Sequence, residues 1–127
     1  MRLLLDTHAL LWWLADDARL GRRARQAIAT PANLVFVSAA TAWEIAVKRA
    51  LGRLVAAGDV EEWLAESDFR PLPIQIAEAV ASAELPPHHR DPFDRLLVAQ
   101  AEIGRMTIVT ADADLAKYGV SVLSAEE

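Results

Sequence analysis

The chain has 127 residues, of which 54% are hydrophobic and 24% are charged, and it contains no cysteine. This composition suits one globular domain spanning residues 1–127, and it excludes a disordered chain, a disulfide scaffold and a zinc site built on thiolates. The formal net charge of −5 argues against a protein that grips nucleic acid through bulk positive charge.

Short apolar runs alternate along the chain with segments of helical character. RLLL at the N-terminus reads as a buried strand, and LVFV at 34–37 is rich in residues that favour strands. RPLPI at 70–74 contains two prolines and therefore fits only the edge of a sheet. The predicted strands are residues 2–5, 34–37, 70–74, 107–110 and 120–123. The predicted helices cover about 9–16, 20–29, 42–51, 59–64, 77–85 and 92–103, with a short helix after 114. Gly52 and Gly104 are expected to end two of them.

Strands that alternate with helices predict an α/β fold with a mainly parallel central sheet of four to five strands, flanked by helices on both faces. Ligands bind such sheets beyond the carboxyl ends of the strands, where the strand order reverses. Asp6 and Asp112 each follow the carboxyl end of a predicted strand. Both are therefore expected to face the same crevice.

The N-terminal stretch MRLLLDTHALLWWLADD is interrupted by Asp6 and His8 and lacks a small-residue cleavage site. It does not fit a signal peptide, and it is too short to span a bilayer. We therefore expect a cytoplasmic protein with no membrane association.

The acids of interest each have a purely structural interpretation. Asp6 fits a helix N-cap, and Glu44 stands four residues before Lys48, the spacing of a helical ion pair. The apolar neighbours of Glu44 nevertheless predict a largely buried helix, in which a carboxylate needs a partner or a metal. The same structural interpretation applies to the remaining acids: Asp91 as an N-cap before Pro92, Asp94 at the third helical position, and Asp112 or Asp114 capping a short helix.

These structural roles do not predict that the acids should meet. Two like unit charges ~4 Å apart repel by about 4 kcal/mol at an effective dielectric near 20, so either pKa values rise or a cation binds. An all-oxygen set of ligands suits Mg²⁺ or Mn²⁺. His88 and His89 suggest zinc, but no third nitrogen or sulfur ligand stands at a convincing spacing.

The segments LLLDTHALLWWL, SAATAWEIAVKRALGRL, LPPHHRDPFDRLLVAQA and VTADADLAKYGV together resemble the PIN-domain family, and more narrowly the VapC-type toxins of VapBC toxin–antitoxin pairs that carry the HRDPFDR signature. The resemblance implies a PIN-like three-layer fold and an Mg²⁺- or Mn²⁺-dependent endoribonuclease. It also implies a homodimer and inhibition by a VapB-like antitoxin.

The resemblance assigns the catalytic acids to Asp6, Glu44, Asp94 and Asp112. Asp6 and Asp94 are the expected principal metal ligands. Glu44 and Asp112 complete the site directly or through water, and Asp91 is an additional candidate ligand of the DPFD subgroup. Glu44 is also a candidate base for hydrolysis of RNA to a 5′-phosphate and a 3′-hydroxyl. Supporting roles fall to the hydroxyls of Ser38 and Thr110.

Several cationic and aromatic residues have two interpretations. Basic groups that suit RNA phosphate, or else a solvated surface, are Lys48, His88, His89, Arg90 and the cluster Arg22, Arg23 and Arg25. The tryptophans fit either the core or a partner-binding surface, and they are Trp12, Trp13, Trp43 and Trp63.

Two other α/β signalling or enzyme classes fit the sequence less well. A receiver domain needs a pair of acids after its first strand and an acceptor aspartate after a central strand, but only Asp6 follows the first strand and Ser38 follows the second. An aspartate-based phosphatase needs Asp-x-Asp where this chain has Asp6-Thr7-His8. A non-catalytic binding module, whose acids serve only as caps, stays open.

Overall fold

The computed structural model describes residues 1–127 and contains one five-stranded sheet in the order β3-β2-β1-β4-β5. Every neighbouring pair of strands is parallel. The predicted α/β fold with a parallel sheet is confirmed. The strands are β1 (Arg2–Leu5), β2 (Leu34–Ser38), β3 (Arg70–Leu72), β4 (Thr107–Thr110) and β5 (Val122–Ser124).

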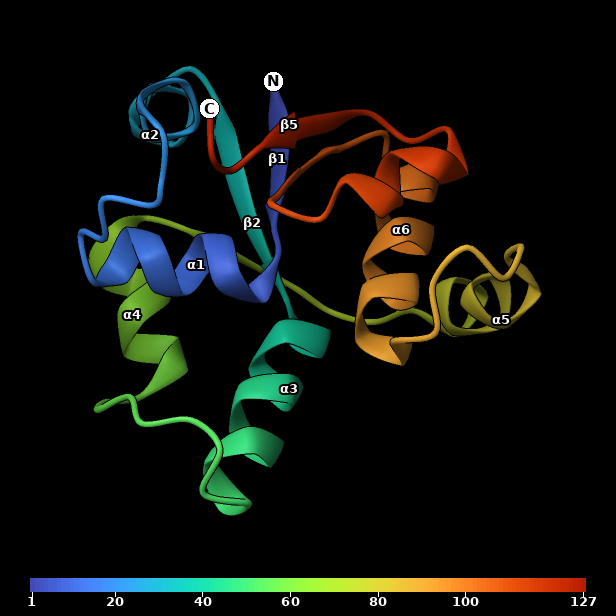
Figure 1. The fold of residues 1–127 in the computed structure, drawn as a ribbon, viewed down its shortest axis with the longest axis horizontal. Helices are drawn as coiled ribbons and strands as arrows, with labels where there is room; N and C mark the ends of the chain where they lie inside the picture. Colours follow the sequence, from blue (N-terminus) through green and yellow to red (C-terminus); the bar gives the residue numbers. More distant parts are fainter.

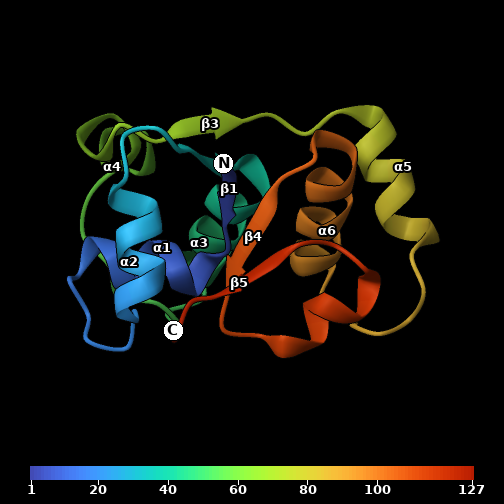
Figure 2. The same ribbon diagram turned by 90° about the horizontal axis from the view of Figure 1, so that it is seen from above.

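Helices cover both faces of this sheet and give the molecule three layers. Figure 2 shows α1, α2 and α4 on one side of the sheet and α5 and α6 on the other. The helix α3 leaves the carboxyl end of β2 and extends beyond the sheet (Figure 1). The helices are α1 (Thr7–Leu14), α2 (Arg22–Ala29), α3 (Ala39–Ala50), α4 (Val60–Ser67), α5 (Ile76–Glu84) and α6 (Pro92–Gly104), with a 3₁₀ helix η1 (Ala113–Tyr118). None of them has the length and apolar character to cross a membrane.

The central strands carry apolar side chains at their inner positions because both faces of the sheet are buried. On β1, Leu3 and Leu5 belong to the cluster under α1 and α2, whereas Leu4 belongs to the cluster under α6. The same alternation holds on β4, where Val109 and Ile108 face opposite sides. Buried apolar side chains on both faces therefore hold β1 and β4 side by side.

The strand order reverses between β1 and β4. The chain proceeds from β1 to β2 and β3 on one side, and then returns to place β4 and β5 on the other. Leu5 is paired with Val109, and the Asp6 backbone N–H donates to the Val109 carbonyl at 3.1 Å. The residues that follow these two strands therefore meet in one crevice, as predicted.

Some element boundaries differ from those predicted. The helix α2 begins at Arg22 because Leu20 is buried in the core and Gly21 is the N-cap. The edge position of β3 is confirmed, but the strand ends at Leu72, before Pro73, which has no N–H to donate. The last strand covers 122–124 and not 120–123.

The long helix ends at Gly104, but its C-cap is Arg105 and not the predicted glycine. Gly104 is the last residue of α6, and Arg105 adopts the left-handed conformation after it, with a φ of 52°. At Gly104 a Cβ would lie 2.9 Å from the Cε of Met106, the end of a flexible side chain. Gly52, with a φ of 69°, does follow α3 as predicted.

The prediction of a largely buried α3 was also wrong. Only one side of this helix packs, and it includes Glu44 and Ile45. Ala46 is exposed, and Trp43 is 58% exposed. The reason is that α3 extends past the end of the sheet, so no second layer covers its outer side (Figure 1).

The loop between α5 and α6 is held by Arg95, a residue that the sequence did not single out. Its guanidinium donates to the carbonyls of Ser82 at 3.0 Å, Leu85 at 2.8 Å, Pro86 at 3.0 Å and His89 at 3.2 Å. The first two carbonyls lie at the end of α5, where no helical N–H remains to bond them. Arg95 therefore acts as a C-cap for α5 and as a clamp on the following loop.

Replacement of Arg95 by Met is expected to lower the free energy of unfolding by about 2–3 kcal/mol, because several partly buried carbonyls lose a charged donor. Lys at this position is expected to recover only part of the loss, since one ammonium cannot match the planar fork of five donors. Urea unfolding measures both effects. Arg90→Met is the matched control in the same loop, because Arg90 is exposed; equal stability of the Arg95→Met and Arg90→Met variants would contradict the clamp.

Candidate active site

Asp6 links the end of β1 to the start of α1 and serves two partners. Its Oδ1 accepts from the Ala9 N–H at 2.8 Å, which makes it the N-cap of α1. Its Oδ2 accepts from the Thr110 hydroxyl at 2.6 Å, across the crevice between β1 and β4. Burial raises the pKa of Asp6, although the hydrogen bonds from Thr110 and Ala9 oppose that shift. Asp6 therefore caps α1 with one oxygen while its other oxygen lies in the crevice.

Glu44 is buried on the inner side of α3, with only 5% of its surface exposed. Its Oε1 accepts from the Thr7 hydroxyl at 2.6 Å, and its Oε2 accepts from the Lys48 ammonium at 2.5 Å. The predicted pair with Lys48 is thus present. The hydrogen bond to Glu44 is also the main reason why the pKa of Lys48 is raised.

Asp91 and Asp94 stand at the start of α6. Asp91 is the N-cap, its Oδ1 accepts from the Phe93 N–H at 2.9 Å, and Pro92 is the first helical residue, as predicted. The Asp94 carboxyl has a pKa raised to about 7. Burial is the main cause, followed by the charge of Asp91, and the charges of Asp6 and Glu44 add to it. Carboxylates from three separate parts of the chain therefore act on Asp94.

Asp112 follows β4 and begins η1. Its Oδ1 accepts from the Asp114 N–H at 2.9 Å, so it is the cap of this short helix. Its Oδ2 lies 2.8 Å from the Nε2 of His89. Asp114 itself is exposed and pairs with Lys117 at 2.9 Å, outside the crevice. Of the two acids predicted as caps here, Asp112 belongs to the cluster and Asp114 does not.

His89 is the residue that sequence reasoning placed least well. It was considered as a zinc ligand, a solvated loop residue or an RNA contact, but its Nε2 also lies 3.3 Å from the Oδ2 of Asp94. Ligand atoms of His89, Asp94 and Asp112 all lie within 4.8 Å of one another. The local signal was its position two residues before the capping Asp91, which turns its ring back toward α6.

The two supporting hydroxyls have different surroundings. Thr110 bonds Asp6 directly and also accepts from the Asp112 N–H at 3.0 Å, so it ties two of the acids together. Ser38 instead caps α3 through the Ala40 N–H and donates to the Gln100 side chain at 2.5 Å. These contacts support Ser38 as a link between α3 and α6, and they give it no bond to an acid.

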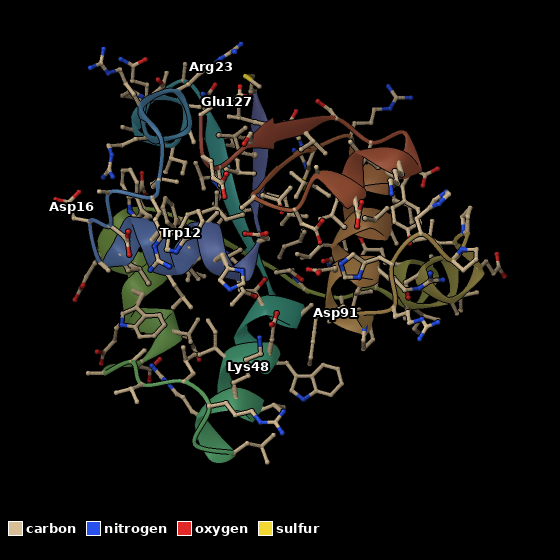
Figure 3. All side chains as sticks on the ribbon, in the orientation of Figure 1. Trp12, Asp16, Arg23, Lys48, Asp91 and Glu127 are labelled. Carbon is tan, nitrogen blue, oxygen red and sulfur yellow. The ribbon has the colours of Figure 1, made fainter.

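The basic residues fall into two groups. Figure 3 places Lys48 and Asp91 at the same end of the molecule, away from Arg23 on α2. Arg23 lies 3.8 Å from Glu127, and Arg25 pairs with Asp16 at 2.6 Å. Arg23 and Arg25 therefore have acidic partners of their own within the chain, apart from the acids of the crevice.

The remaining polar loop residues and the tryptophans have mixed surroundings. His88 is exposed and packs against Tyr118 with ring centroids 5.0 Å apart, and Arg90 is exposed. Trp12 is buried in the core, whereas Trp43 stands beside Phe93 with ring centroids 5.0 Å apart and is largely exposed. Trp12 thus belongs to the core, and Trp13 and Trp63 are partly buried against it. Trp43 is exposed, and a partner-binding role for it stays a prediction.

A groove of about 720 Å³ lies next to the acids, between α1, the end of α3 and α4. Thr7, His8 and Lys48 belong to its lining, so the groove borders the residues that surround Glu44. Trp12 and Trp63 supply part of its apolar wall. None of the four acids lines this groove, which meets their surroundings only through Thr7 and Lys48.

Comparison with known proteins agrees with this architecture. The family model of the PIN domain matches residues 3–120. Ribonuclease VapC22 of Mycobacterium tuberculosis is 33% identical over 118 residues, which cover 91% of this chain and 90% of that protein.

Two solved structures share the fold. VapBC2 from Rickettsia felis, bound to a DNA fragment from its promoter, has a TM-score of 0.67 at 12% identity and covers 97% of this chain and 98% of that one. A toxin–antitoxin complex from Klebsiella pneumoniae has a TM-score of 0.65 at 22% identity, with 98% of each chain covered. The match to the domain model over nearly the whole chain, together with the VapC relative, shows that this chain belongs to the PIN-domain family.

Proposed function

We propose that this chain is a divalent-metal-dependent endoribonuclease and the toxin component of a type II toxin–antitoxin system, acting in the cytoplasm as one domain over residues 1–127. The observation that carries the proposal is that, in addition to burial, the charges of Asp6 and Glu44 raise the pKa of Asp94, while Asp94 and Asp112 both face the Nε2 of His89. The name of the VapC22 relative supports RNA as the substrate. The toxin–antitoxin complexes of the same fold support a VapB-like antitoxin as partner, and we further propose a homodimer.

The site suits a hard cation. Asp6 and Asp94 both have a raised pKa, chiefly through burial, so two carboxylates are held where ionisation is unfavourable without a positive charge nearby. Their ligand atoms are oxygens, which favours Mg²⁺ or Mn²⁺. In this proposal Asp6 and Asp94 hold the ion, and Asp91, Glu44 and Asp112 contribute directly or through water.

When bound, such an ion supplies a more acidic water and stabilises charge on a phosphodiester. The chain's own residues supply the rest. Glu44 accepts hydrogen bonds from Thr7 and Lys48 and so keeps its carboxylate in place, suited to accept a proton from the attacking water. The Lys48 ammonium, 40% exposed at the rim, suits an RNA phosphate.

The wild-type protein is expected to cleave single-stranded RNA in Mg²⁺ or Mn²⁺ and to leave 5′-phosphate and 3′-hydroxyl ends. Cleavage is expected to stop in EDTA and to return when the ion is restored. Labelled RNA on a denaturing gel, with phosphatase treatment of the products, measures both points. Cleavage that persists in EDTA would contradict metal dependence.

A non-catalytic binding module is the second candidate, and one observation favours it: Asp6, Asp91 and Asp112 each cap a helix. In that case the acids have a sufficient structural reason to be present. Titration with Mn²⁺ separates the two functions, because a module of caps gives neither RNA cleavage nor stabilisation by the ion.

A further inference from the structure

His89 has a hydrogen bond that decides the state of its ring. The backbone N–H of Asp91 donates to its Nδ1 at 3.0 Å. A nitrogen that accepts carries no proton, so the neutral imidazole bears its only proton on Nε2. The His89 ring therefore presents its Nε2–H to the crevice as a hydrogen-bond donor.

That donor faces two carboxylates from different parts of the chain. Nε2 lies 2.8 Å from Oδ2 of Asp112 at the start of η1, and 3.3 Å from Oδ2 of Asp94 on α6. The Asp112 side chain is 37% exposed, whereas that of His89 is 19% exposed. The better buried imidazole thus holds the second oxygen of a partly exposed carboxylate, whose first oxygen already caps η1.

The same geometry argues against His89 as a metal ligand. A histidine that binds a metal usually donates its other ring N–H to a carbonyl or a carboxylate. Here the other nitrogen accepts from a backbone N–H. Binding an ion through Nε2 would require either an imidazole with no proton at all or the loss of the bond to Asp91.

The ring is held in place from both sides of its loop. Arg95 donates to the His89 carbonyl, which fixes the backbone before α6. The Asp91 side chain caps α6, which fixes the N–H that His89 accepts. The orientation of the imidazole is thus built into the junction between the loop and the helix.

We propose that His89 is a positioning residue, whose Nε2–H holds the Asp112 carboxylate beside Asp94 so that both can share one cation. This inference rests on the proposed metal-dependent function and adds a residue to it. It also excludes a mixed His–Asp–Asp site for a softer metal.

The first test measures metal binding. His89→Ala is expected to weaken Mn²⁺ binding about tenfold, the lower end of what loss of an outer-shell partner costs. His89→Gln is expected to restore most of that affinity, because its amide N–H can take the place of Nε2–H. The matched control is His88→Gln, which changes the neighbouring exposed ring and is expected to leave Mn²⁺ affinity unchanged. Unchanged affinity in His89→Ala, or equal losses in His89→Ala and His89→Gln, would overturn the proposal.

The second test examines the ring itself. Nitrogen-15 NMR of the metal-free wild-type protein is expected to show a proton on Nε2 and none on Nδ1 of His89. Pulsed EPR of the Mn²⁺-loaded wild type is expected to show no directly coordinated nitrogen. A proton on Nδ1, or a nitrogen ligand to Mn²⁺, would overturn the positioning role. Absence of Mn²⁺ binding in the wild type would instead contradict the proposed function. The two failures can be told apart because the tautomer is measured without the ion.

Discussion

Asp94→Asn is expected to abolish RNA cleavage and, at the same time, to stabilise the metal-free protein. The loss of activity, at least about 10³-fold, follows from removing a ligand and a charge from the centre of the site. The gain in stability follows from the raised pKa of Asp94, since a neutral amide of the same shape does not repel Asp91. Cleavage assays and urea unfolding measure the two effects.

The gain in stability depends on pH in a defined direction. The unfolded carboxyl ionises near 3.8 and the folded one near 7, so the native state binds the extra proton between these values and the wild type loses stability as pH rises through them. Asp94→Asn is therefore expected to stabilise the protein by about 2–4 kcal/mol at pH 8 and by much less at pH 4. Asp114→Asn is the control, because Asp114 lies outside the crevice, and it is expected to retain full activity.

Asp6→Asn is likewise expected to abolish RNA cleavage. An asparagine keeps the N-cap, because its amide oxygen can accept from the Ala9 N–H, and the Thr110 hydroxyl can accept from its amide group. The fold is thus expected to survive. Retention of cleavage by both Asp6→Asn and Asp94→Asn would contradict the assignment of these two acids as metal ligands.

Addition of Mn²⁺ is expected to raise the thermal midpoint, and to do so more at pH 8 than at pH 6. An ion at 100 times its Kd stabilises by about 2.7 kcal/mol, which corresponds to about 8 °C for a domain of this size. Below pH 7 the ion must displace the proton of Asp94, so affinity is expected to fall about tenfold per pH unit.

Thermal unfolding with and without Mn²⁺ at the two pH values measures this difference. Asp94→Asn provides the control, since without the titrating carboxyl the remaining shift is expected to depend less on pH. Equal shifts in the wild type at pH 6 and pH 8 would show that Asp94 is not displaced by the ion.

The strands could be predicted from the sequence because each one is marked by the residue types within its own short segment. The run at 34–37 is wholly apolar, three leucines follow Arg2, and Ile and Val stand together at 108–109, a pattern that burial on both faces explains. Acids that follow strands in such a sheet must meet at one edge, so the placement of Asp6 and Asp112 needed no contact information.

The parts that could not be predicted depend on packing between distant segments. The role of His89 requires the Asp91 N–H on one side and the Asp112 carboxylate on the other, 23 residues away. Trp43 is exposed because α3 extends past the sheet and no other helix covers its outer side. The sequence of α3 does not reveal this arrangement. Gly104 was predicted as the C-cap because glycine favours the left-handed conformation, but Arg105 adopts that conformation instead.

Two aspartates serve both a helix end and the crevice, and this affects what a mutation at either position does. Asp6 and Asp112 each give one oxygen to a helix end and the other to the crevice. A single-nucleotide change from Asp to Asn preserves the first bond and removes the charge from the second. If the proposed function holds, a chain that folds normally but cannot cleave is therefore one nucleotide change away.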